Sequence, residues 1–228
     1  KFHQDDLKRI AESLERGWVG MGPHVSEFES RFADYTKAAE AVSCSSGTTA
    51  LHLALAAADI GPGDEVIVPS FTWVSSVNAI IYQGATPILC DIDLDTYALS
   101  PNALEACITP KTRAVMPVHL FGCAAPMDRI MTIAKTYKLM VIEDAACALG
   151  TWINGRHAGT VGDFGTFSFH PRKTITTGEG GMVLASSDKQ ISVLQTLRNH
   201  GINTQGVVQA LGFNYRLSDV QGALGVGQ

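Results

Sequence analysis

The chain has 228 residues, of which 46% are hydrophobic and 17% are charged, and its formal net charge is −5. This length suffices for one domain with a large apolar core. The acidic balance, without a cluster of lysines and arginines, excludes a charge-driven partner such as nucleic acid or an anionic membrane. No apolar run is long enough to cross a bilayer. The five cysteines are widely spaced and form no C-x-x-C pair, so we expect free thiols, no metal site and a cytoplasmic location.

Short β-type runs alternate with longer helical patterns along the chain. The predicted strands are Ala41–Ser43, Glu65–Pro69, Thr86–Asp91, Ala114–His119, Leu139–Asp144, Gly165–Phe169 and Gly181–Ala185. The predicted helices are Thr48–Ala58, Val74–Gln83, Met127–Tyr137 and Ile191–Leu197. The alternation predicts one α/β domain with a mostly parallel central sheet and helices on both faces. A last helical pattern, Leu217–Gly225, is interrupted by the end of the chain at Gln228, so we expect a truncated domain.

The first site candidate is the run Ser45–Ala50 (SSGTTA), which follows a predicted strand and opens an apolar helix. Ligands of open α/β sheets bind beyond the carboxyl ends of the strands. Small residues and hydroxyls at a helix N-terminus offer a phosphate free N–H groups and the positive end of the helix dipole. The run matches neither the dinucleotide fingerprint nor the P-loop pattern. It could bind phosphate or could be an ordinary helix cap.

Two further candidates follow later strands. Glu143 and Asp144 end an apolar strand, where a buried carboxylate needs a partner. Asp144 could bind a protonated ring nitrogen or cap a following helix. Trp73, after the strand VIVPS, could stack on a flat heterocycle or pack in the core.

Lys173 lies in FSFHPRKTITTGEGGMV, between a β-type run and a glycine-rich turn. Burial there would lower the lysine pKa, and a neutral amine can form a Schiff base with a carbonyl. Alternatively, the lysine could be exposed or structural. Ser168 precedes it as a second phosphate donor. A phosphate cradle, a stacking aromatic, a ring carboxylate and a Schiff-base lysine together favour pyridoxal 5′-phosphate as the cofactor.

The order of several segments resembles the DegT-type nucleotide-sugar aminotransferases, which are fold-type-I enzymes dependent on pyridoxal phosphate. These segments are SSGTTALHLAL, VPSFTWVSSVNAI, DIDLDTYALSP, PVHLFG, VIEDAACALGT, the lysine segment and LGFNYRLSDVQGALG. The resemblance extends from about Gly17 to Gly225. It implies that residues 1–228 form the cofactor-binding large domain, with an N-terminal helical segment, and that most of a smaller carboxyl-terminal domain is absent.

The resemblance also implies a role for each candidate residue. Lys173 would be the catalytic lysine that forms the Schiff base, and Asp144 the catalytic partner of the pyridine nitrogen. Asn214 would reach the phosphate of a neighbouring subunit, which implies a homodimer. Cys147 stands where the family often has a glutamine or histidine that contacts the ring hydroxyl. The implied cofactor-binding residues are Gly47, Thr48, Trp73, Asp144, Cys147, Ser168, Lys173 and Asn214.

The implied function is transfer of an amino group, with glutamate as the expected donor, to a keto group of a nucleotide-activated deoxy-sugar. The product would serve amino-sugar and polysaccharide biosynthesis. A lysine at position 173, where the dehydratase branch has histidine, favours transamination. Two alternatives stay open: a truncated, non-catalytic module that binds ligand or dimerises, and a sugar dehydratase with the same cofactor. The segment Trp18–Pro23 (WVGMGP) lacks two hydroxyls of the family's WLTTGP and leaves the sugar unspecified.

Overall fold

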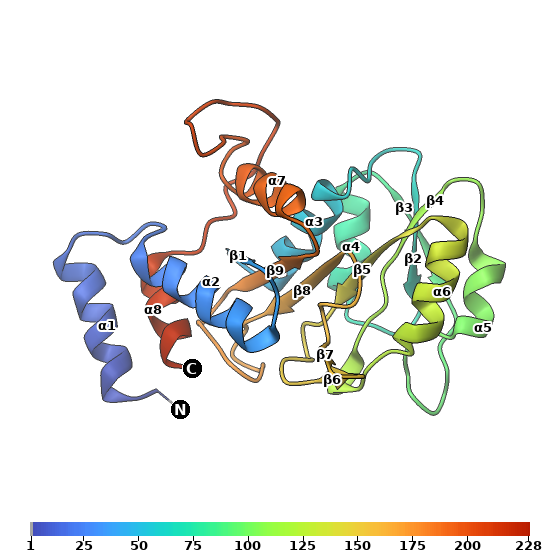
Figure 1. The fold of residues 1–228 in the computed structure, drawn as a ribbon, viewed down its shortest axis with the longest axis horizontal. Coiled ribbons are helices and arrows are strands. Elements are labelled where there is room, and N and C mark those ends of the chain that lie inside the picture. Colours follow the sequence, from blue (N-terminus) through green and yellow to red (C-terminus); the bar gives the residue numbers. More distant parts are fainter. Residues whose placement is uncertain (1) are drawn as a thin grey trace.

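A computed structural model describes residues 2–228, and seven strands of this chain form one sheet in the order β1-β9-β8-β5-β4-β2-β3 (Figure 1). The strands from β8 through β5, β4 and β2 to β3 are parallel, whereas β9 runs antiparallel to both β1 and β8. The strands of the sheet are β1 Ala41–Cys44, β2 Glu65–Pro69, β3 Thr86–Cys90, β4 Thr112–Val115, β5 Met140–Asp144, β8 Phe164–Ser168 and β9 Gly181–Ala185. The predicted α/β class and the mostly parallel sheet are confirmed.

Helices cover both faces of the sheet (Figure 1). Helices α3, α4 and α7 pack over one face, α2 and α8 cover part of the other face beside α5 and α6, and α1 packs on α8. The helices are α1 Gln4–Glu15, α2 Pro23–Thr36, α3 Gly47–Ala57, α4 Val74–Tyr82, α5 Pro101–Leu104, α6 Met127–Tyr137, α7 Asp188–Arg198 and α8 Asp219–Gly227. Within residues 2–228, no helix combines the length and the apolar character that a bilayer crossing requires.

Burial on both faces explains why the central strands are apolar without alternation. In β2, Val66 and Val68 pack under α3 and α4, whereas Ile67 between them packs toward α5 and α6. Successive side chains of a strand point to opposite faces, so a strand covered on both sides needs an apolar residue at every position. These uninterrupted apolar runs are the reason that the central strands could be predicted from the sequence.

The fourth strand is shorter than predicted, because the prediction extended it to His119 and the ladder ends at Val115. Pro117 has no N–H with which to continue a regular ladder. The chain nevertheless stays extended: Met116 N donates to Ile67 O at 2.7 Å, and Pro117 O accepts from Asp144 N at 2.9 Å. The prediction missed helix α5 and the hairpin of β6 Trp152–Ile153 and β7 Arg156–His157.

Candidate functional site

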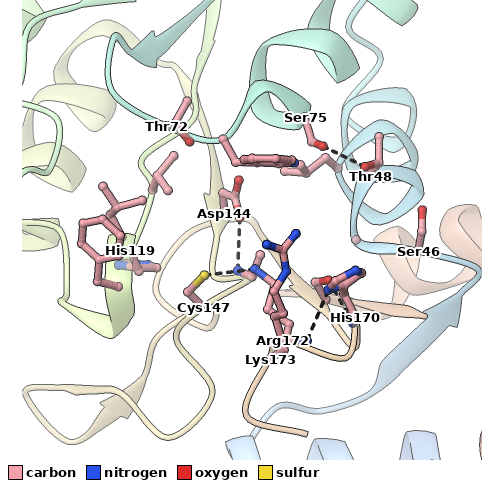
Figure 2. Close-up of a pocket in the computed structure, with 18 of the residues that line it drawn as sticks. Ser46, Thr48, Thr72, Ser75, His119, Asp144, Cys147, His170, Arg172 and Lys173 are labelled. Carbon is pink, nitrogen blue, oxygen red and sulfur yellow. Dashed lines mark hydrogen bonds between the residues drawn. The ribbon is translucent and has the colours of Figure 1, made fainter. Parts of the chain in front are cut away.

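A cavity of about 520 Å³ lies beyond the carboxyl ends of the parallel strands (Figure 2). Its walls come from the first turns of α3 and α4, from residues 118–121 after β4, from the end of β5, and from the turn after β8. Seven of the eight cofactor-binding residues predicted from the sequence line this one cavity: Gly47, Thr48, Trp73, Asp144, Cys147, Ser168 and Lys173.

The eighth predicted residue, Asn214, does not line the cavity. It is exposed and forms an isolated antiparallel bridge with Asn199. The expectation that Asn214 serves a neighbouring subunit therefore stays a prediction.

The N-terminus of α3 is capped and still leaves N–H groups free. Ser46 is the N-cap: its Oγ accepts from Thr49 N at 3.1 Å, and Thr49 Oγ1 accepts from Ser46 N at 2.9 Å. The N–H groups of Gly47 and Thr48 have no hydrogen-bond acceptor in the described part of the chain. A Cβ atom on Gly47 would lie 2.6 Å from the Cβ of Ser168, so only glycine allows this approach. The helix-cap interpretation of the SSGTTA run is confirmed. The N–H groups that stay free could also bind an anion, so phosphate binding by this run stays a prediction.

Asp144 ends strand β5 in the cavity wall, with only 5% of its surface exposed. Its Oδ2 accepts from Ser76 Oγ at 2.7 Å and its Oδ1 from Ala146 N at 3.1 Å. Ser76 Oγ also lies 3.0 Å from Thr72 Oγ1. Residues 145–150 form turns, so the alternative of a helix cap is wrong. These donors satisfy a carboxylate that burial would otherwise penalise.

Trp73 is the N-cap residue of α4, and 70% of its surface is exposed. Because it borders the cavity, the alternative that it packs in the core is wrong. The next residues supply site hydroxyls that the sequence analysis missed: Ser75 Oγ accepts from Thr48 Oγ1 at 2.9 Å, and Ser76 binds Asp144. Two serines at the first turn of a helix, directly after an aromatic candidate, were the signal that could have identified them.

Lys173 lies in a tight turn after β8, where its N–H donates to His170 O at 2.9 Å. Its Nζ is 3.0 Å from Cys147 Sγ, and Figure 2 shows both side chains pointing into the cavity near Asp144. The lysine is half-buried, so the full burial considered in the sequence analysis is not found. The turn presents the amine to the cavity rather than enclosing it in the core.

Glu143 lies on the opposite side of β5 from Asp144 and is fully buried. Its carboxylate accepts from His119 Nε2 at 2.8 Å, and from the N–H groups of Gly159, Val161 and Gly162 at 2.9, 2.7 and 2.6 Å. Burial alone would raise the pKa of Glu143, but these hydrogen bonds outweigh it and hold the pKa below its ordinary value.

His119 connects this buried carboxylate to the cavity wall. Its Nδ1 accepts from Ala125 N at 3.0 Å, so its proton lies on Nε2, which donates to Glu143. Leu120 and Phe121 follow in the wall, and Phe121 has a φ of 55°, which is uncommon for a residue other than glycine. The Glu143–His119 pair therefore anchors the segment that shapes this side of the cavity.

Three polar residues close to Lys173 in sequence also line the cavity. His170, Arg172 and Glu179 line the cavity, and Arg172 and Glu179 are exposed to solvent. Within residues 2–228, no three or more His, Cys, Asp and Glu side chains are grouped to hold a metal ion. The cavity combines an amine, a shielded carboxylate, an exposed indole and a helix N-terminus, which together suit a flat, phosphorylated, carbonyl-bearing ligand.

The chain is similar in sequence to a known protein family and to a curated protein. A family model described as the DegT/DnrJ/EryC1/StrS aminotransferase family matches residues 1–228. Over 222 residues the chain is 47% identical to the GDP-perosamine synthase of Caulobacter vibrioides, covering 96% of this chain and 60% of that relative. The chain thus spans about 60% of the length of this curated relative.

Solved structures agree with the family match. The aminotransferase from Psychrobacter cryohalolentis is similar with a TM-score of 0.95 and 34% identity, covering 99% of this chain and 61% of that one. NtdA from Bacillus subtilis, with bound cofactor PMP, is similar with a TM-score of 0.92 and 33% identity, covering 98% and 52%.

Proposed function

The chain belongs to the DegT/DnrJ/EryC1/StrS aminotransferase family, and from this premise we propose that it is a pyridoxal 5′-phosphate-dependent sugar aminotransferase. It transfers an amino group, with glutamate as the donor, to a keto group of a nucleotide-activated deoxy-sugar. The product serves amino-sugar and polysaccharide biosynthesis. The observation that carries the proposal is the meeting of the Lys173 amine, the shielded Asp144 carboxylate and the α3 N-terminus in one cavity.

The α3 end of the cavity fits the cofactor's phosphate. The free N–H groups of Gly47 and Thr48 and the hydroxyls of Thr48 and Ser168 would hold it, because a helix N-terminus favours an anion. The contact between Gly47 and Ser168 leaves no room for a side chain at this point, so the backbone itself forms the cradle. Residues 1–228 act here as one cofactor-binding domain, since one sheet carries every wall of the cavity.

The other end of the cavity fits the ring. Trp73 would cover one face of it, Asp144 would bind its nitrogen, and Cys147 would lie near its hydroxyl. When bound, the cofactor supplies a carbon that carries the amino group and a ring that withdraws electrons. Ser76 and Ala146 hold the Asp144 carboxylate in place, so that it can keep a proton on the ring nitrogen. Lys173 would hold the cofactor and move the substrate proton through its Nζ as general acid and base.

The protein works as a homodimer in this proposal, with Asn214 of each chain serving the phosphate site of the other. Its support is the exposed position of Asn214 near exposed apolar side chains of the same loop, Val207, Val208 and Leu211. The free thiols of Cys44 and Cys90, both buried, support a cytoplasmic location. The mass of the protein in solution tests the dimer.

The visible spectrum of the purified protein, followed by borohydride reduction and peptide mapping, tests the cofactor and its lysine. We expect a yellow protein whose cofactor is fixed on Lys173 after reduction, and an unchanged result in a Lys111→Ala control. Glutamate-dependent amination of a nucleotide-linked keto-sugar tests the reaction. A colourless protein that takes up no pyridoxal phosphate would contradict the proposal. Deoxygenation of the sugar without glutamate use would identify a dehydratase, and cofactor binding without turnover a non-catalytic module.

A further inference from the structure

Arg172 lines the cavity, and the proposed function assigns no role to it. Arg172 and Lys173 are the two lysine or arginine side chains among the residues that line the cavity. Lys173 is committed to the cofactor and to proton transfer. Figure 2 shows the guanidinium of Arg172 directed into the cavity that Thr48 and Asp144 also line. A second cation therefore faces the place where the chemistry occurs.

The guanidinium of Arg172 is also unpaired. Arg31 pairs with Glu27 and Arg198 with Glu29, whereas Arg172 has no ion-pair partner in the described part of the chain. Glu179 borders the same cavity without forming a pair with it. An exposed, unpaired guanidinium keeps all its donors available, and its planar fork matches a carboxylate with two parallel hydrogen bonds.

The two substrates differ in where they carry negative charge. In an amino acid the α-carboxylate is attached to the same carbon as the amino group, so it must lie close to the atom on which Lys173 acts. In a nucleotide-linked keto-sugar, the phosphates are attached through the anomeric carbon and the keto carbon itself is neutral. A cation next to the reacting amine in sequence, and in the same cavity, thus matches the amino acid. Resting on the proposed function, we infer that Arg172 binds the α-carboxylate of the amino donor.

This role makes Arg172 a specificity-determining residue. It selects α-amino acids over simple amines in the donor half of the reaction. The acceptor half, in which a neutral keto carbon occupies the same place, does not need it.

The test compares Arg172→Gln with the parent protein and with Arg113→Gln, an exposed arginine on β4 outside the cavity. Uptake of pyridoxal phosphate is measured first, by absorbance, and all three proteins are expected to take it up equally. The spectral change on adding glutamate then gives the concentration for half-maximal reaction. We expect Arg172→Gln to raise this concentration about 10- to 100-fold, the range for a lost charge-assisted hydrogen-bond pair, and Arg113→Gln to leave it unchanged.

Two further measurements isolate the carboxylate. 4-Aminobutyrate, which is glutamate without its α-carboxylate, is expected to react with the same concentration dependence in the parent protein and in Arg172→Gln. Binding of 2-oxoglutarate, which has no amino group to transfer, is measured by calorimetry on the cofactor-loaded protein and is expected to weaken about tenfold or more. Arg172→Lys should be intermediate, because it keeps the charge and loses the fork.

The outcomes separate this inference from the proposed function. Normal cofactor uptake with unchanged glutamate dependence in Arg172→Gln would overturn the inference and leave the function intact. Reduced cofactor uptake would assign Arg172 to the cofactor phosphate, and weaker keto-sugar binding with unchanged glutamate dependence would assign it to the acceptor; either overturns the inference. Absence of cofactor uptake by the parent protein would contradict the function itself.

Discussion

The end of strand β5 places two adjacent carboxylates in opposite surroundings. Glu143 points away from the cavity, is fully buried and accepts four hydrogen bonds. Asp144 borders the cavity and accepts two, from Ser76 and from Ala146. Successive side chains of a strand face opposite sides, so one residue step separates a structural carboxylate from one available to a ligand. The four hydrogen bonds to Glu143 occupy the acceptor sites of its carboxylate, so Glu143 serves the fold. Asp144 accepts only two and keeps acceptor sites for a bound group.

The largest expected effect is on stability, at Glu143. Glu143→Gln places an amide N–H₂ group among N–H donors and removes the charge that His119 and the backbone stabilise. We expect a loss of about 3–6 kcal/mol in the free energy of unfolding, because two of the four hydrogen bonds to the buried carboxylate are lost and each is worth about 1.5–3 kcal/mol. Denaturant unfolding measures it, and Glu40→Gln, at an exposed glutamate, serves as the control. A loss no larger than in the control would break the distinction between the two carboxylates.

The next effect is on activity, at Asp144. Asp144→Asn keeps the size of the side chain and one acceptor oxygen for Ser76, but it cannot stabilise a proton on a ring nitrogen. We expect transamination to fall about 10²- to 10³-fold, the typical loss when an electrostatic group of a reaction site is removed, while unfolding changes by about 1 kcal/mol. Rates and cofactor absorbance measure this, with Asp34→Asn as an exposed control. Unchanged rates would assign Asp144 to the fold, like its neighbour.

Acid should also test the buried hydrogen bonds of Glu143. The folded-state pKa of Glu143 is lowered, so below the ordinary glutamate pKa of about 4.3 the unfolded chain binds a proton that the folded chain does not. The stability contribution of Glu143 is therefore complete above that pH and is lost as the pH falls toward the folded-state pKa. Denaturant unfolding between pH 6 and pH 3 measures this loss. Glu143→Gln should show a shallower decline than the parent protein, and equal slopes would contradict the assignment.

The sequence was sufficient to predict where the central strands lie along the chain, but not the order in which the strands pair in the sheet. Each central strand was predictable because burial on both faces requires continuous apolar residues, as in β2. The position of β9 between β1 and β8, antiparallel to both, depends on contacts between distant segments and carries no local pattern.

The same limit applies to the site. Lys173 and Asp144 could be singled out as candidates because their chemical types are unusual beside apolar strands, and both line the cavity. The contacts that hold them were not, since Ser76 is 68 residues from Asp144 in sequence and His119 is 24 residues from Glu143. The sequence likewise could not show that Arg172 lacks an ion-pair partner within residues 2–228, because this depends on where its possible partners lie in space.

The smallest expected effect concerns the hydrogen bond from Ser76 to Asp144, 2.7 Å long. Ser76→Ala removes one donor and leaves the one from Ala146, so the carboxylate stays in place with more freedom. We expect the free energy of unfolding to fall by about 0.5–1.5 kcal/mol, the usual net value of one hydrogen bond. Transamination should fall by less than in Asp144→Asn, because the ring partner itself persists. Ser30→Ala, at an exposed serine of α2, is the control. A rate as low as that of Asp144→Asn would mean that Ser76, rather than the strand end, determines where the carboxylate points.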